Sequence, residues 1–248
     1  MDEQIRDRIL RPTQINCVIP GSTPVISFGD FTNARIASLS INPSSKEFLK
    51  GKDLLPLNQK RLVDRDVLGI SAQDKISEAH VNKVWEGCCG YFSPDRNPYS
   101  WFDDLESILN YSNFSYFNGT ASHIDLVQSA TFPAWAALTP EIKRELLDAD
   151  YEFFKYQTAL PSLEAILING RQVFDVAIRT RGFELKVVDQ IFLKSGNRRI
   201  PTSVFTGVGP NNKRVFGWTG TLKSLRIDGN ERASLYANLG ERLEKFLS

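Results

Sequence analysis

The sequence predicts an α/β fold: a three-layer domain with a central, mainly parallel four-stranded sheet flanked by helices. Two observations predict it. Four short apolar runs, each of the length of one buried strand, alternate with longer segments that have helical apolar spacing. The 248 residues contain no internal repeat, low-complexity tract or Gly/Ser linker, so we expect one domain over residues 1–248.

The first apolar run, residues 35–41, stops at Asn42-Pro43-Ser44-Ser45. Asn or Ser can cap a helix and Pro fits the first turn, so this point predicts a buried strand that leads directly into a helix. The other three predicted strands are 122–128, 163–168 and 215–218, and residues 184–193 and 199–206 predict an antiparallel pair. Helical spacing covers residues 1–10, 56–68, 73–87, 140–158, 171–180 and 230–247, with an aromatic-rich loop over 90–102.

Composition narrows the function classes. Lys and Arg number 30 against 29 Asp and Glu, a net charge of +1, which excludes a globally basic nucleic-acid-binding surface but leaves room for a local one. We expect a cytoplasmic protein, because the charged N-terminus is no secretory signal and no apolar run approaches the ~20 residues of a membrane span. The three cysteines, two of them adjacent, offer no CxxC pair for a metal or iron–sulfur cluster. No cofactor is predicted, and the oligomeric state stays open.

One segment breaks the charge balance. Residues 194–226 carry seven basic and no acidic residues, interleaved with Gly, Asn, Ser and Thr that leave backbone amides available. This pattern is typical of a surface that follows phosphates, and a solvated basic hairpin without a ligand is the alternative. The basic residues are Lys194, Arg198, Arg199, Lys213, Arg214, Lys223 and Arg226.

Standard catalytic motifs are missing from the sequence. His123 and Asp125 have strand spacing, which places both on one face, but no particular serine is marked to complete a triad. Asn42 at the end of a predicted strand can hold a water with its side chain, or it can simply cap a helix. Ligands bind at the carboxyl ends of strands in such sheets, so these positions are the candidate site.

Four segments, taken together, resemble the uracil-DNA glycosylase superfamily. Residues 40–45 (Ser-Ile-Asn-Pro-Ser-Ser) resemble its first active-site motif, and residues 218–224 (Trp-Thr-Gly-Thr-Leu-Lys-Ser) resemble its second. Between them, residues 124–128 resemble the strand that carries the base-reading Asn, and residues 163–171 its third strand and turn. The order and spacing of these pieces fit over roughly residues 25–245.

The resemblance implies a role for each matching residue. Asn42 would be the catalytic residue that positions water, and Leu222 the wedge that fills the space left by a flipped base. Trp218 stands where the superfamily often has His, so the role of that His is vacant or supplied by another residue. Phe48, or Phe28 and Phe31, would replace the aromatic residue that usually stacks on the flipped base. The implied base pocket comprises Asp125, Ser44, Phe48, Trp218 and His123; the implied DNA contacts are Pro43, Ser45, Leu222, Ser224, Arg226, Arg198, Arg199, Lys213, Arg214 and Lys223.

The sequence therefore predicts a monofunctional DNA glycosylase that flips and excises a pyrimidine, with DNA as its partner. Ser44 follows the motif proline where uracil-specific relatives have a bulky aromatic, which leaves room for a C5 substituent. Asp125 aligns with the base-reading Asn, and its carboxylate can accept from N4 of cytosine. A C5-modified cytosine, hydroxymethylated or glucosylated as in phage DNA, is the expected base. The alternatives are a uracil-excising repair enzyme, a non-catalytic nucleic-acid-binding protein of the same fold, and a serine hydrolase that uses His123 and Asp125.

Overall fold

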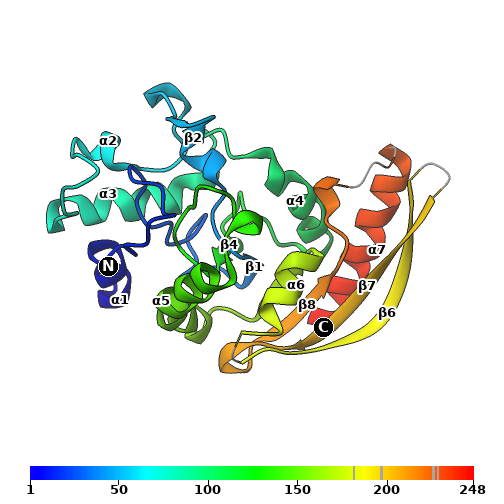
Figure 1. The fold of residues 1–248 in the computed structure, drawn as a ribbon. Coiled ribbons are helices and arrows are strands. Elements are labelled where there is room, and N and C mark those ends of the chain that lie inside the picture. The colour runs from blue at the N-terminus through cyan, green and yellow to red at the C-terminus, as the bar shows by residue number, and fades with distance from the viewer. Residues whose placement is uncertain (181, 196–197, 225–226, 228) are drawn as a thin grey trace. The chain divides into compact units, whose positions relative to one another are not determined.

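The strands form a six-stranded mixed sheet in the order β4-β1-β5-β8-β7-β6, seen in the computed structural model, which describes residues 1–180, 182–195, 198–224, 227 and 229–248 (Figure 1). β5 pairs in parallel with both β1 and β8, whereas β7 is antiparallel to β8 and to β6. The chain is thus an α/β protein with a mainly parallel core. The strands are β1 (Ile36–Ser40), β4 (Ala121–Asp125), β5 (Ala165–Asn169), β6 (Glu184–Ser195), β7 (Arg198–Val208) and β8 (Arg214–Trp218).

All four apolar runs form strands, and the predicted antiparallel pair exists as β6 and β7. The prediction of four strands was wrong because β7 also pairs with β8, from Val204↔Trp218 to Val208↔Arg214, and so adds the pair to the sheet. The sequence shows that two strands form a hairpin but carries no signal for which free edge that hairpin joins. A separate two-stranded ladder, β2 (Leu49–Lys50) with β3 (Asp53–Leu54), was not predicted.

Helices occupy most of the predicted ranges. The predicted helix over 56–68 is reduced to a single 3-10 turn and α2, because Asp64 caps a new helix start by accepting from the Val67 amide at 2.9 Å. The predicted helix after Asn42 is only a three-residue 3-10 turn, Ser45–Glu47, capped by Ser44. The helices are α1 (Glu3–Leu10), α2 (Arg65–Leu68), α3 (Glu78–Cys89), α4 (Asp103–Leu109), α5 (Pro140–Ala159), α6 (Arg171–Ala177) and α7 (Gly229–Leu247).

The chain divides into two compact units, which we describe separately. The first unit comprises residues 1–31, 40–98 and 123–157, and the second comprises 32–39, 99–122 and 158–248. In the first unit the Phe31 ring makes edge-on contacts with Trp85 of α3 and with Phe153 and Tyr156 of α5. These contacts join two helices to the segment that precedes β1.

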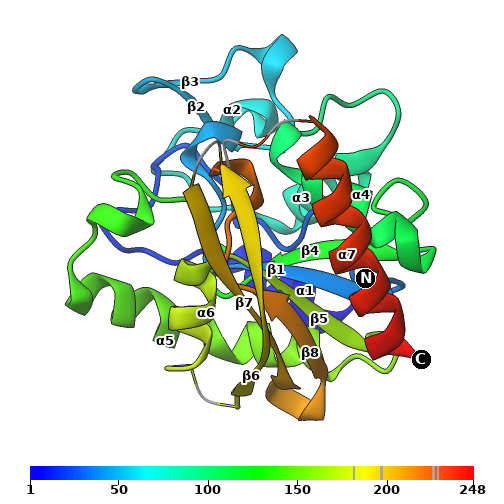
Figure 2. The same cartoon turned by 90° about the vertical axis from the view of Figure 1, so that its right-hand side faces the viewer.

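In the second unit, α6 and α7 pack on opposite faces of the same strands (Figure 2). The Phe174 ring of α6 lies 4.5 Å from that of Phe205 on β7, and the Phe246 ring of α7 lies 5.6 Å from that of Phe216 on β8. Phe205 is in register with Gly217, where a Cβ would lie 2.5 Å from the phenylalanine ring. The close approach of this ring to β8 requires glycine at position 217.

The three thiols of the chain are all unpaired with one another. Cys17 and Cys88 are buried, and Cys89 is half-buried. Desolvation by burial raises the pKa of all three, that of Cys88 to about 11. The thiols are therefore protonated at neutral pH.

Candidate functional site

Asn42 lies where the chain leaves β1, beside the segment that follows β4. The two segments stay paired beyond the strands, since the Leu126 and Val127 amides donate to the Ser40 and Ile41 carbonyls at 3.1 and 2.9 Å. The Asn42 side-chain amide nitrogen donates to the Ser129 carbonyl at 3.4 Å and to Thr131 Oγ1 at 3.2 Å. A backbone carbonyl only accepts, so the NH₂ group must face it.

This fixed orientation leaves Oδ1 of Asn42 as the available atom. Among the residues that the structure describes, none donates a hydrogen bond to it, and the side chain is only half-buried. An oriented amide oxygen that is accessible to solvent can accept a hydrogen bond from a water molecule. The predicted water-positioning role therefore has a suitable geometry.

A buried polar network holds the segment that contacts Asn42. Gln128 donates through its side chain to the Asp125 carbonyl at 2.9 Å, and its backbone amide donates to Asp150 Oδ2 at 2.7 Å. Asp150 in turn forms a buried ion pair with Arg8 at 2.8 Å. The network ties α1 and α5 to the turn that begins at the end of β4, and so fixes the backbone that orients Asn42.

His123 and Asp125 lie side by side on one face of β4, as their spacing predicts. His123 Nε2 lies 3.5 Å from Asp125 Oδ1, which is longer than a normal hydrogen bond, and that oxygen has no hydrogen-bond partner in the described part of the chain. Asp125 is 3% exposed. Burial raises the pKa of its carboxyl, and the His123 ring opposes that shift.

A second buried acid, Glu47, lies close to Asp125 and was missed by the sequence reasoning. Glu47 accepts from Tyr91 Oη at 3.0 Å and from Arg61 Nε at 2.8 Å. Burial raises the pKa of Glu47, Arg61 and Tyr91 oppose the rise, and the Asp125 carboxyl adds to it. Ser44-x-x-Glu47 has the spacing of a capping box, which is typical of an exposed helix start. This spacing therefore gives no indication that the Glu47 side chain is buried.

The raised pKa of Asp125 gives a testable pH dependence. A carboxyl whose folded pKa lies above its unfolded value keeps its proton longer when folded, so its contribution to stability is full below the unfolded pKa and is lost as the pH rises through the folded pKa. We expect Asp125→Asn to make the fall in stability above the ordinary pKa of an aspartic acid, about 4, shallower in urea-unfolding measurements. Asp189→Asn is the surface control; since the pKa of Asp189 is lowered, its removal must not reproduce the effect. An unchanged pH profile in Asp125→Asn would contradict the assignment.

The remaining first-unit candidates divide into exposed and buried residues. Ser44 is exposed, and its hydroxyl accepts from the Lys46 amide at 3.3 Å. Ser45 is half-buried, whereas Pro43 and Phe48 are buried. Phe48 is 1% exposed and is therefore a core side chain, like Phe28 and Phe31. None of these three rings lies open for stacking in this structure.

In the second unit, Asn169 and Trp218 end two neighbouring strands in register. Trp218 is fully buried, and its indole nitrogen has no hydrogen-bond partner among the described residues; nor has Asn169 Oδ1. Buried polar atoms of this kind are uncommon in folded proteins. A donor and an acceptor therefore lie at adjacent strand ends, where α/β sheets place their ligands.

The basic segment is not one surface. The Lys213 ammonium donates to the Leu160 and Leu163 carbonyls, both at 2.8 Å, and burial lowers its pKa. The Arg214 guanidinium stacks 4.5 Å from the Phe246 ring centre. Both residues lie at the start of β8, whereas Trp218 lies at its other end. The sequence pattern shows the charges but does not tell which end of a strand each charge occupies.

The other motif-two candidates are only partly described. Leu222 is 1% exposed, which is the burial of a core leucine, so a wedge role would require this side chain to leave its present position. The Lys223 ammonium donates to the Ser100 carbonyl at 2.9 Å. Arg226 lies outside the described residues, as do the side chains of Arg198 and Ser224.

Within the described ranges, no group of three His, Cys, Asp or Glu side chains is arranged to hold a metal ion. No helix in the described part of the chain is both long and apolar enough to cross a bilayer. In sequence comparisons, the chain matches no protein-family model and no curated protein.

Proposed function

We propose that the protein is a monofunctional DNA glycosylase. One observation carries the proposal: the Asn42 amide is fixed by the Ser129 carbonyl and Thr131 so that its oxygen is left to hold a water. Excision of a base passes through an oxocarbenium-like sugar, as in other glycosyl chemistry, so the water needs positioning more than activation. The C1′–N bond breaks with its electron pair on the departing base, and water adds to C1′. The proton that the water loses neutralises the base, and an abasic site remains.

The proposed fold is the three-layer arrangement of the uracil-DNA glycosylase superfamily. The helices α6 and α7 on opposite faces of β7 and β8 support it. Four strands, β4, β1, β5 and β8, correspond to the four predicted runs. In this assignment the β6–β7 pair is an addition at one edge.

For the substrate, we propose a pyrimidine that is read by Asp125. A carboxyl with a raised pKa holds its proton more readily, and a protonated carboxyl has one donor and one acceptor. It can accept from N4 of cytosine and donate to N3. A neutral carboxyl fits uracil as well, because it can donate to O4 and accept from N3. The preference for cytosine over uracil is therefore strongest where Asp125 is ionised. Exposed Ser44 after the motif proline supports a base with a C5 substituent, such as hydroxymethylated or glucosylated cytosine.

The test measures alkali-sensitive strand breaks in matched duplexes that contain uracil, thymine, 5-hydroxymethylcytosine or its glucosylated form. We expect release of a C5-modified cytosine, with breaks only after alkali, because no lysine is assigned to form a Schiff base. Asp125→Asn is expected to shift the preference towards uracil, since an amide matches O4 and N3 of uracil with its two ends. Release of uracil alone, unchanged by this substitution, would identify the uracil-excising alternative.

A second candidate is a nucleic-acid-binding protein without catalysis. Trp218 favours it, because a fully buried indole stands where the superfamily often has the His that stabilises the departing base. Binding to the same duplexes without strand breaks on any of them would select this function.

A further inference from the structure

The β6–β7 pair extends beyond the rest of the sheet. The two strands pair from Glu184↔Val208 to Ser195↔Arg198, with one register shift between Val187 and Asp189, whereas β8 pairs only with residues 204–208 of β7. Because β7 is antiparallel to β8, residues 198–202 continue past the carboxyl end of β8 with β6 as their partner strand (Figure 2). Five residues of strand span about 17 Å. We call residues 190–195 and 198–202 the ribbon.

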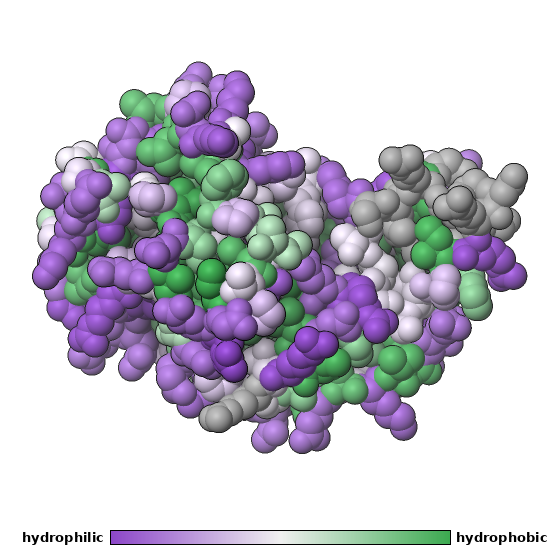
Figure 3. Space-filling model, viewed as in Figure 1, coloured by the Kyte–Doolittle hydropathy of each residue, from purple (hydrophilic) through white to green (hydrophobic). Residues whose placement is uncertain are grey.

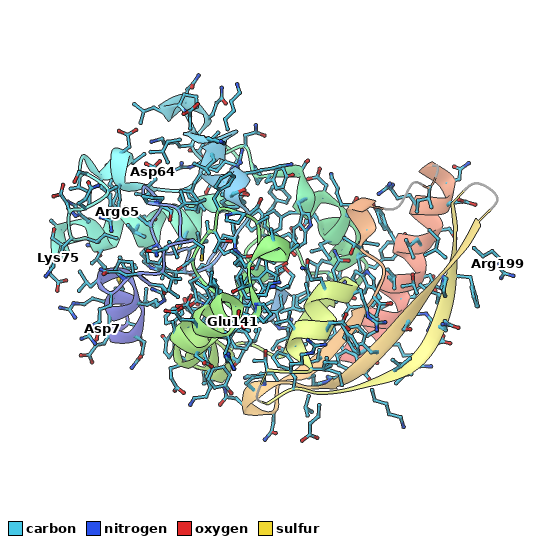
Figure 4. The ribbon with its side chains drawn as sticks, in the orientation of Figure 1. Asp7, Asp64, Arg65, Lys75, Glu141 and Arg199 are labelled. Carbon is cyan, nitrogen blue, oxygen red and sulfur yellow. The ribbon has the colours of Figure 1, made fainter. Side chains whose placement is uncertain are left out.

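The two faces of the ribbon differ. One face is turned towards α7, where Thr202 is buried and Asp189, at the base of the ribbon, pairs with Arg242 at 2.7 Å. The other face presents the exposed side chains of Phe192, which is 53% exposed, and of Arg199 and Pro201. We call this the outer face, and Figure 4 shows Arg199 projecting from it on the side away from α7.

An aromatic–cation pair lies on the outer face. The Arg199 guanidinium lies 4.8 Å from the centre of the Phe192 ring. The pair holds the long arginine side chain against the strand, so less conformational freedom is lost when the guanidinium binds a further group. An apolar ring beside an oriented cation suits a partner that offers apolar edges next to negative charge.

The charge of the ribbon also indicates an anionic partner. No acidic residue occurs in the sequence from Gln190 to the end of the basic segment at position 226, and this stretch includes Lys194, Arg198 and Arg199. Of these three, the structure describes only the side chain of Arg199. The acid that precedes this stretch in the sequence, Asp189, is paired with Arg242. Figure 3 shows hydrophilic side chains over much of the visible surface, with hydrophobic ones mainly in its middle and lower right. The described outer face thus combines the Arg199 guanidinium with the exposed Phe192 ring.

We infer that the outer face of the ribbon lies in the major groove of the bound duplex and contacts the C5 edges of pyrimidines in that groove. The inference rests on the proposed function. The major groove is about 12 Å wide, admits a two-stranded β-ribbon and displays the C5 position of pyrimidines. Arg199 contacts a phosphate, and Phe192 contacts C5 substituents. The ribbon thereby reads modification on paired bases of the duplex.

The first test measures the salt dependence of binding to a duplex. Arg199→Gln is expected to reduce the slope of log K against log salt by roughly 0.9, the value for one lost phosphate contact on B-DNA. Lys186→Gln removes the same charge from an exposed position near the other end of β6 and is expected to leave the slope unchanged. Equal slopes for Arg199→Gln and the wild type would overturn the inference.

The second test separates groove reading from general affinity. Phe192→Ala is expected to weaken binding roughly tenfold, or about 1.4 kcal/mol, on duplexes whose cytosines carry C5 substituents, and to have less effect on unsubstituted duplexes. An equal loss on both, or a loss confined to single-stranded DNA, would overturn the groove assignment. Excision by the wild type is measured in parallel at low salt, and its absence rejects the proposed function. Normal excision, together with unchanged DNA binding by Arg199→Gln and Phe192→Ala, rejects only the proposed contact of the ribbon with DNA.

Discussion

Asn42→Ala is expected to abolish base excision while the fold and the affinity for DNA stay close to wild type. The amide of Asn42 donates to Ser129 and Thr131 and leaves its oxygen for water, so truncation removes the positioning group. General acid–base assistance contributes typically ~10²–10⁴-fold, and a loss in this range is expected for single-turnover excision. The two lost hydrogen bonds lie at a half-buried site and affect stability little by comparison.

Asn42→Asp is the matched variant, because it keeps an acceptor oxygen for the water and loses only the NH₂ group that donates to the Ser129 carbonyl and Thr131. We expect its excision rate to exceed that of Asn42→Ala, and circular dichroism with equilibrium DNA binding checks that both variants are folded. Turnover of Asn42→Ala within a few-fold of wild type would reject Asn42 as the residue that positions water.

Asp150→Ala is expected to give the largest loss of stability, about 3–5 kcal/mol in the free energy of unfolding. The substitution leaves the buried Arg8 guanidinium without its carboxylate partner and removes the acceptor of the Gln128 amide. Glu152, two residues further along α5, supplies the control, because its ion pair with Lys155 is exposed. Glu152→Ala should cost no more than about 1 kcal/mol in the same urea titration, and equal effects of the two substitutions would contradict the network.

The sequence predicts the strands of this protein better than its site. Short apolar runs bounded by Asn, Gly and Pro locate β1, β4, β5 and β8, because burial on both faces of a parallel strand requires continuous apolar residues. The hairpin was also predicted, but its attachment to β8 depends on side-chain packing between Phe205 and Gly217 that no local pattern reveals.

The site residues were predicted from individual strand ends, and the structure shows what surrounds each of them. Period-two alternation places His123 and Asp125 together, and the structure brings them to within 3.5 Å. Glu47 escaped notice because its partners, Arg61 and Tyr91, come from distant loops. Lys213 was assigned to DNA from charge alone, yet its ammonium binds two carbonyls at the start of β8.

The protonated state of the three cysteines has a practical consequence for spectroscopy. Maleimides and spin labels react with thiolates, and burial raises the pKa of Cys17, Cys88 and Cys89, so native labelling at neutral pH is expected to be slow. A single cysteine introduced at exposed Pro201 would therefore label selectively in the otherwise native chain. A fluorophore or nitroxide at that position could follow the approach of the hairpin to DNA without a cysteine-free background.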